Sequence, residues 1–154
     1  MTVAAETDVA FHYPQSRAVV MGVCPNSDKE TPVFGGSGSV SANRMESILP
    51  WWKDQAVGAN AWWTKSQFMA ARPSHIDQIL DDTGCIVVIA LGLEVQRELG
   101  VSEGPFYSWT IIEHDERNVH VLRFPHPSGL NRHWNKVGNR VVASDALADA
   151  LTRR

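Results

Sequence analysis

Cysteine is scarce in this sequence, and long apolar runs are missing from it. Only Cys24 and Cys85 occur among the 154 residues, too few thiols for a four-cysteine zinc or iron-sulfur site. No run approaches the roughly 20 apolar residues of a membrane span, and residues 1–7 lack the basic and then apolar pattern of a signal peptide. We therefore expect a protein of a reducing cytoplasm with no membrane partner.

Carboxylates are missing from one long stretch of the chain. The net charge of −3 argues against a protein that binds nucleic acid through bulk electrostatics. Between positions 117 and 140, however, three histidines and five basic residues occur without a single Asp or Glu. The basic residues are Arg117, Arg123, Arg132, Lys136 and Arg140. This local positive charge indicates either a phosphate-binding surface or a solvated face on which charges cluster by chance.

Apolar runs that end at glycine indicate an α/β fold. Residues 85–91 are seven consecutive apolar residues before Gly92, a pattern typical of a strand buried on both faces of a parallel sheet. Further strands are expected at 17–23, 60–64, 107–113 and 118–124, turns at 81–84 and 114–117, and helices at 41–49, 73–80, 93–99 and 144–151, the last capped by Ser144. We predict one domain over residues 1–154, a three-layer α/β/α fold around a central, mainly parallel four- to five-stranded sheet.

Two loops are expected at the carboxyl edge of this sheet, where open α/β sheets bind ligands. The loop after the opening strand starts with Gly22, Val23, Cys24, Pro25 and Asn26. The loop after the last strand is formed by His126, Pro127, Ser128, Gly129, Leu130, Asn131 and Arg132. Together with the central strand-glycine-helix segment, the order and spacing over residues 19–132 resemble those of the uracil-DNA glycosylases. The motifs are most similar to the mismatch-specific uracil/thymine branch and to single-domain bacterial or phage branches.

The resemblance implies an enzyme that flips a base out of DNA and breaks its N-glycosidic bond. His126 then hydrogen-bonds the pyrimidine O2 and stabilises the leaving base. Ser128 holds a phosphate, and Leu130 is a wedge that fills the space of the flipped base. The full set of implied DNA contacts is Ser128, Gly129, Leu130, Asn131 and Arg132.

The same resemblance implies a base pocket built from the first loop and a middle strand. Its residues are Gly22, Val23, Pro25, Asn26, Val33, Phe34 and Asn60. Val33 or Phe34 stacks on the base, and Asn60 reads its edge unless it is a turn residue. Cys24 stands where many family members have Asp or Asn. We expect it to be either a neutral, buried thiol or a direct participant in catalysis.

We therefore expect a monomeric DNA glycosylase that acts on uracil or a related modified or mismatched pyrimidine, without cofactor or metal, in a bacterial or virus-infected cell. Val23 and Cys24 favour a different possibility, a superfamily member with weak or no hydrolysis that binds DNA, a modified base or a partner protein. The low overall charge favours a third, hydrolysis of a free nucleoside or nucleotide. The tryptophan pairs at 51–52 and 62–63 are interpreted as core residues rather than as stacking platforms. The five histidines other than His126 are interpreted as surface or structural residues.

Overall fold

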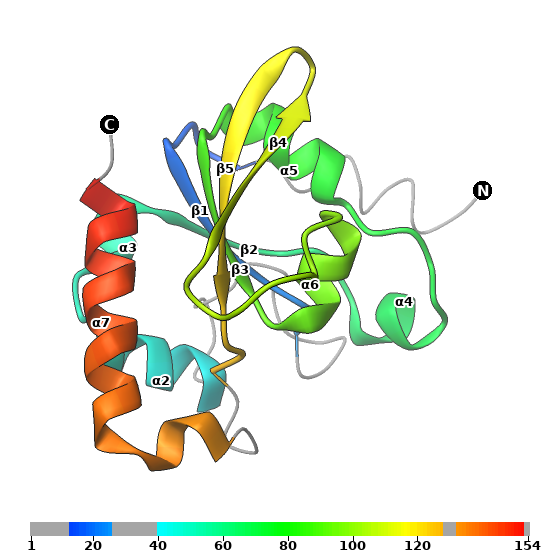
Figure 1. Cartoon of the computed structure of the whole chain (residues 1–154). Helices are drawn as coiled ribbons and strands as arrows, with labels where there is room; N and C mark the ends of the chain where they lie inside the picture. Colours follow the sequence, from blue (N-terminus) through cyan, green and yellow to red (C-terminus); the bar gives the residue numbers. More distant parts are fainter. Residues whose placement is uncertain (1–12, 26–39, 128–131, 153–154) are drawn as a thin grey trace.

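The computed structural model describes residues 13–25, 40–127 and 132–152, with a five-stranded sheet at its centre (Figure 1). The strand order is β2-β1-β3-β5-β4. The strands are β1 (Ala18–Gly22), β2 (Val57–Asn60), β3 (Val87–Leu91), β4 (Trp109–His114) and β5 (Arg117–Phe124). β1 pairs in parallel with β2 and β3, β3 pairs in parallel with β5, and β4 runs antiparallel to β5. The predicted α/β fold with a mainly parallel sheet is confirmed.

Helices cover both faces of the sheet. They are α2 (Val40–Ile48), α3 (Trp52–Gln55), α4 (Lys65–Met69), α5 (Ile76–Thr83), α6 (Leu93–Glu98), the 3₁₀ helix η1 (Arg132–Asn135) and α7 (Val137–Thr152). In Figure 1, α2, α3 and α7 lie on one side of the sheet, and α4, α5 and α6 lie on the other. Because β1, β2, β3 and β5 run in the same direction, their carboxyl ends lie together at the carboxyl edge of the sheet. Among the described helices, none is long and apolar enough to cross a membrane.

β3 is buried on both faces, as its sequence predicts. Side chains of successive strand residues point to opposite faces of a sheet. Val88 and Ala90 accordingly enter the core beneath α5 and α6. Ile89 and Leu91 enter the second core, which α2, α3 and α7 cover. The central strand therefore connects both hydrophobic cores.

The strand predicted at 60–64 lies earlier in the chain. β2 covers Val57–Asn60, and the next residues follow β1 for only two more bonds, in which Ala61 N donates to the Gly22 carbonyl and Trp62 N to the Val23 carbonyl. Thr64 is the N-cap of α4, because its hydroxyl accepts from Gln67 N at 3.0 Å. This capping ends the extended segment where the sequence pattern continued it.

The predicted bounds of two helices are also wrong. The last helix begins at Val137, so Ser144 lies in its interior rather than at its cap. α5 begins at Ile76 and includes the predicted turn residues up to Thr83, because Gly84 at φ 60° ends the helix in the left-handed conformation. The hairpin turn between β4 and β5 is tighter than expected, with positive φ at both Asp115 and Glu116.

Most of the paired tryptophans belong to the core. Trp52 and Trp63 are at most 1% exposed, and Trp62 is 6% exposed. Trp51 is 37% exposed, so it is the member of the two pairs that reaches solvent. The interpretation of these pairs as core residues is confirmed for the three that are buried.

We expect Leu147→Ala to lower the free energy of unfolding by about 2–5 kcal/mol, because it leaves a cavity between α7 and the sheet. Val141→Ala serves as a matched control on the same helix, where the valine is 56% exposed. It should change stability by less than about 0.5 kcal/mol. Urea denaturation measures both, and equal losses would mean that α7 does not cover the core as described.

Candidate functional site

The carboxyl edge of the sheet gathers the residues that the sequence singled out. Val23 and Cys24 follow β1, Asn60 closes β2, and His126 comes two residues after β5. The strand order places Asn60 on one side of the first loop and His126 on the other. Gly22 is in register with Asn60, so the two parallel strands end together. The fold thus brings both predicted loops to one edge.

His126 is held in a confined setting. Its ring lies against Gly92, where an added Cβ would come within 2.9 Å of the imidazole Cδ2. Its carbonyl accepts a hydrogen bond from the indole of Trp134 at 2.8 Å. Burial lowers the pKa of His126, which favours a neutral imidazole at pH 7. The contact with Gly92 and the hydrogen bond from Trp134 therefore confine His126 within the site.

Gln96 connects the ends of the two strands beside this ring. Its side-chain amide is 3% exposed and donates to the Ala90 carbonyl at 3.1 Å and to the Phe124 carbonyl at 3.2 Å. The Phe124 carbonyl also accepts from Gly92 N at 2.9 Å. Gln96 is a positioning residue that sequence reasoning missed, because nothing distinguishes its amide from that of a surface glutamine on a helix.

Asn60 carries a buried acceptor at the same edge. Its side chain is 4% exposed, and within the described part of the chain its Oδ1 has no hydrogen-bond partner. A buried polar atom in this state destabilises a fold by about 1–3 kcal/mol. Such an atom is a natural place for a ligand to donate a hydrogen bond.

The backbone after Asn60 is fixed by aromatic packing. The Trp63 ring stacks on His75 with centroids 3.8 Å apart and an angle of 15° between the planes. His75 N donates to the Ala61 carbonyl at 2.7 Å, and the Trp62 indole donates to the Arg72 carbonyl at 2.7 Å. These contacts hold Asn60 in place and give His75 a structural role.

The two thiols lie at opposite edges of the sheet, Cys24 at the carboxyl ends of the parallel strands and Cys85 at their amino ends. Cys24 is half-buried and packs, with Val23, against the core beneath α5 and α6. Cys85 precedes β3, where burial raises the pKa of its thiol. Because parallel strands separate these edges, the two cysteines cannot act together. Only Cys24 is near the predicted site.

Several predicted site residues lie outside the described part of the chain. They are Asn26, Val33, Phe34, Ser128, Gly129, Leu130 and Asn131. Arg132 is described and lies exposed at the start of η1. The roles predicted for these seven residues and for Arg132 stay predictions.

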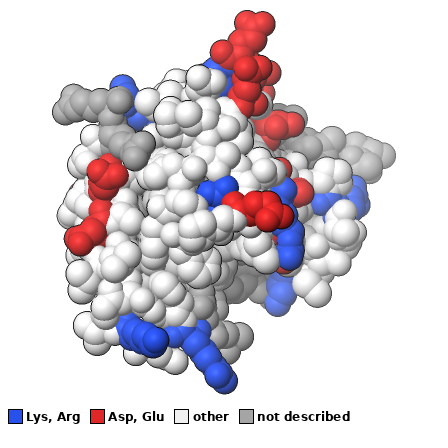
Figure 2. Space-filling model, viewed as in Figure 1, with Lys and Arg blue, Asp and Glu red and all other residues white. Residues whose placement is uncertain are grey.

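The basic stretch divides into structural and exposed residues. Arg117 donates to the Leu80 carbonyl at 2.9 Å. Arg123 is 7% exposed and donates to the Val101 carbonyl and to the hydroxyls of Ser108 and Thr110. The residues of the stretch that remain exposed are Arg132, Lys136 and Arg140. Figure 2 shows basic side chains at the lower end of the molecule, where α7 begins in Figure 1.

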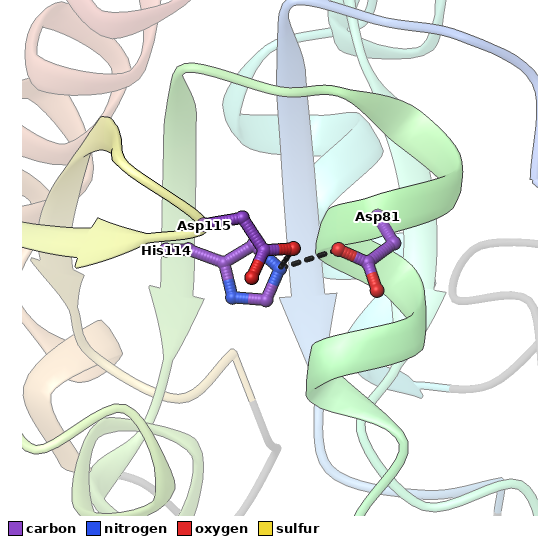
Figure 3. Close-up of side chains that lie close together, drawn as sticks. All are labelled: Asp81, His114 and Asp115. Carbon is purple, nitrogen blue, oxygen red and sulfur yellow. Dashed lines mark hydrogen bonds and ion pairs between the residues drawn. The ribbon is translucent and has the colours of Figure 1, made fainter.

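A separate polar cluster connects α5 to the β4–β5 hairpin (Figure 3). The His114 Nε2 lies 2.6 Å from an Asp81 carboxylate oxygen and 3.4 Å from one of Asp115. The hydrogen bond from His114 lowers the pKa of Asp81. These nitrogen and carboxylate groups are close enough to share a cation, but they already bond one another and lie at the edge opposite His126. We interpret the cluster as a clamp on the hairpin.

The chain matches no protein-family model and no curated protein, so the resemblance rests on the residues named above.

We expect Gly92→Ala to destabilise the protein and to displace His126. The alanine meets both a φ of +88° and the imidazole ring. Gly100→Ala is the matched control, since Gly100 has a φ of +74° but an added Cβ there meets no described atom within 4 Å. The backbone cost of a left-handed residue is about 1–2 kcal/mol, and it is higher at Gly92, because φ 88° with ψ 167° lies in a region that essentially only glycine adopts. The ring contact should add about 1–3 kcal/mol for Gly92 alone. Urea unfolding and the NMR shifts of the His126 ring distinguish them, and identical results would exclude the contact.

We expect Asp81→Asn to weaken the fold in a pH-dependent way. Because the folded-state pKa of Asp81 is lowered, its stabilisation is present above the unfolded-state pKa and is lost as the pH falls through the folded-state pKa. The Asp81 side chain is 54% exposed, so the effect should not exceed about 1 kcal/mol at pH 7. Urea midpoints of wild type and variant should converge towards acidic pH. Asp77→Asn, at a position that is 92% exposed and 3.9 Å from His114, should show no such difference.

Proposed function

We propose that the protein is a DNA glycosylase that flips out uracil, or a related modified or mismatched pyrimidine, and hydrolyses its N-glycosidic bond. One observation carries the proposal: the carboxyl edge unites Asn60, whose buried Oδ1 has no partner among the described residues, and the confined ring of His126 on either side of Val23. In this proposal, Asn60 is the acceptor that reads the base and His126 is the donor to the leaving base.

The strand order sets the spacing of the two groups. β2 and β5 are separated by three strand spacings, roughly 14 Å in all. The ends of β1 and β3 lie between them. A base of a duplex can reach this edge only after it has left the stack.

Asn60 supports a preference for uracil-like bases. An amide oxygen accepts a hydrogen bond, and the N3 position of uracil or thymine carries an N–H that can donate one. Cytosine has a bare acceptor nitrogen at N3 and carries its donor on the exocyclic N4 instead, so it cannot make this hydrogen bond. A site built around such a hydrogen bond rejects an analogue that lacks the donor.

His126 supports stabilisation of the departing base. As the bond between the base and the sugar breaks, its electron pair moves to the base, and negative charge gathers on the pyrimidine O2. A preorganised N–H near that oxygen stabilises the transition state more than the substrate. A neutral imidazole supplies this donor, and water adds to the cationic sugar carbon.

A second candidate function follows from the first loop. In its described residues, 22–25, the loop contains no carboxylate that could activate the water. A protein with this loop can bind an extruded base without hydrolysing its bond efficiently. The alternative is a superfamily member that binds DNA, a modified base or a partner protein.

Excision from labelled oligonucleotides distinguishes the two functions. The panel contains uracil, mismatched thymine, and hydroxymethylated or glycosylated pyrimidines. Wild type should form abasic sites, and His126→Ala should lower the rate by about 10²–10³ through loss of the donor. His120→Ala, a substitution within β5 away from the carboxyl edge, should retain activity.

Two further variants refine the assignment. Asn60→Ala should lose activity, whereas Asn118→Ala at an exposed position of β5 should not. Loss of excision in Cys24→Ala would give the thiol a direct role. If wild type releases no base but still binds DNA, the glycosylase proposal is wrong and the binding function replaces it.

A further inference from the structure

Three exposed cations, in η1, directly before α7 and in the first turn of α7, form a row in the sequence that starts six residues after His126. Arg132, Lys136 and Arg140 follow one another at intervals of four residues and are all exposed. Lys136 directly precedes α7, and its carbonyl accepts from Asn139 N at 3.1 Å. Lys136 is the residue before α7 and Arg140 lies in its first turn, so both lie at the same end of this helix.

Acidic groups do not balance this row within its own segment. Positions 132–144 contain no Asp or Glu, and Asp145 is the first acid along α7. The neighbouring helix α2 adds another cation, since the Arg44 guanidinium lies 5.8 Å from the centroid of the Trp134 ring. Glu46 on α2 is paired with Lys53 at 2.9 Å. Figure 2 shows no acidic side chain beside the basic ones at this end of the visible face.

Trp134 connects the row to the candidate site. Its indole donates to the His126 carbonyl at 2.8 Å. Its own carbonyl accepts from Arg140 Nε at 3.1 Å, which uses one of the five N–H donors of that guanidinium. The row is therefore anchored to the backbone that carries His126.

We propose that Arg132, Lys136 and Arg140 form a phosphate track, a surface that binds the backbone of the DNA on which His126 acts. This inference rests on the proposed function for the identity of the ligand. Sugar and phosphate contacts from Lys and Arg fix the position of DNA on a protein without reading its sequence. The track orients the duplex so that the target base lies above the carboxyl edge. It extends the predicted contact of Arg132 by a further helical turn.

Salt dependence of binding to an undamaged duplex tests the track without any excision. Each lost phosphate contact should reduce the slope of log affinity against log salt by about 0.9. For Lys136→Ala this corresponds to an affinity loss of roughly fifteenfold at 50 mM salt and about fourfold at 200 mM. Lys136→Arg should retain the wild-type slope, and Lys136→Ala combined with Arg132→Ala should remove about twice as much. Fluorescence anisotropy with a labelled duplex measures these values.

The matched control is Lys65→Ala, which removes the same charge from an exposed position on α4. It should leave the slope unchanged. Equal slopes for Lys136→Ala and Lys65→Ala, or no duplex binding by wild type at 50 mM salt, would overturn the track. If wild type excises bases but Lys136→Ala has the wild-type slope, the track is refuted and the glycosylase proposal stands. If Lys136→Ala has a reduced slope but wild type excises no base, the track stands and the glycosylase proposal is refuted.

Discussion

The parallel pairing of β3 with β1 and β5 is the constraint on which the rest of the structure depends. Because the three strands run in the same direction, the loops that follow β1 and β5 leave the sheet at one edge. Because β3 is apolar on both faces, helices must cover it from two sides, and α6 and α7 do so. Two segments about 100 residues apart in the chain thereby meet at one edge, as is usual in open α/β sheets.

The two sides of the candidate site differ in how far the protein itself satisfies their polar groups. On the His126 side, Gly92 lies against the ring, Trp134 donates to the His126 carbonyl, and Gln96 donates to the Phe124 carbonyl two residues earlier. On the Asn60 side, a buried oxygen has no partner within residues 13–25, 40–127 and 132–152, a local destabilisation that natural proteins tolerate mainly at functional positions. A rigid donor and an unsatisfied acceptor together favour binding of a polar ring.

The sequence predicted the features that depend on local pattern. The strand β3 is clear because seven apolar residues end at a glycine, and the hairpin is clear because polar turn residues separate two β-rich runs. The start of α7 was missed because Val137, Val141 and Val142 are exposed, so the first turns of the helix lack an apolar face. β2 was misplaced because the apolar run continues to Trp63 beyond the end of the strand.

The contacts within the site required the tertiary structure. Both acceptors of Gln96 lie on strands that other segments bring to it, and the partner of His114 is 33 residues away in the chain. The same holds for the basic stretch, in which Arg123 is internal and Lys136 is exposed although both were alike in sequence. By contrast, the motif around His126 indicated from the sequence that this residue lies in the site, because the motif consists of residues that are adjacent in the chain.

The described charged residues are distributed unevenly over the molecule, which the net charge of −3 does not show. The described acids Asp81, Asp82, Asp115 and Glu116 gather where α5 meets the hairpin, at the amino edge, whereas the phosphate track lies at the other end of the molecule (Figure 2). A polyanion is repelled from the first end and attracted to the second. At 0.1 M salt such interactions decay over about 10 Å, so the two ends act nearly independently. In the proposed function, this charge distribution would direct a duplex to the carboxyl edge, which carries His126, despite the net charge of −3.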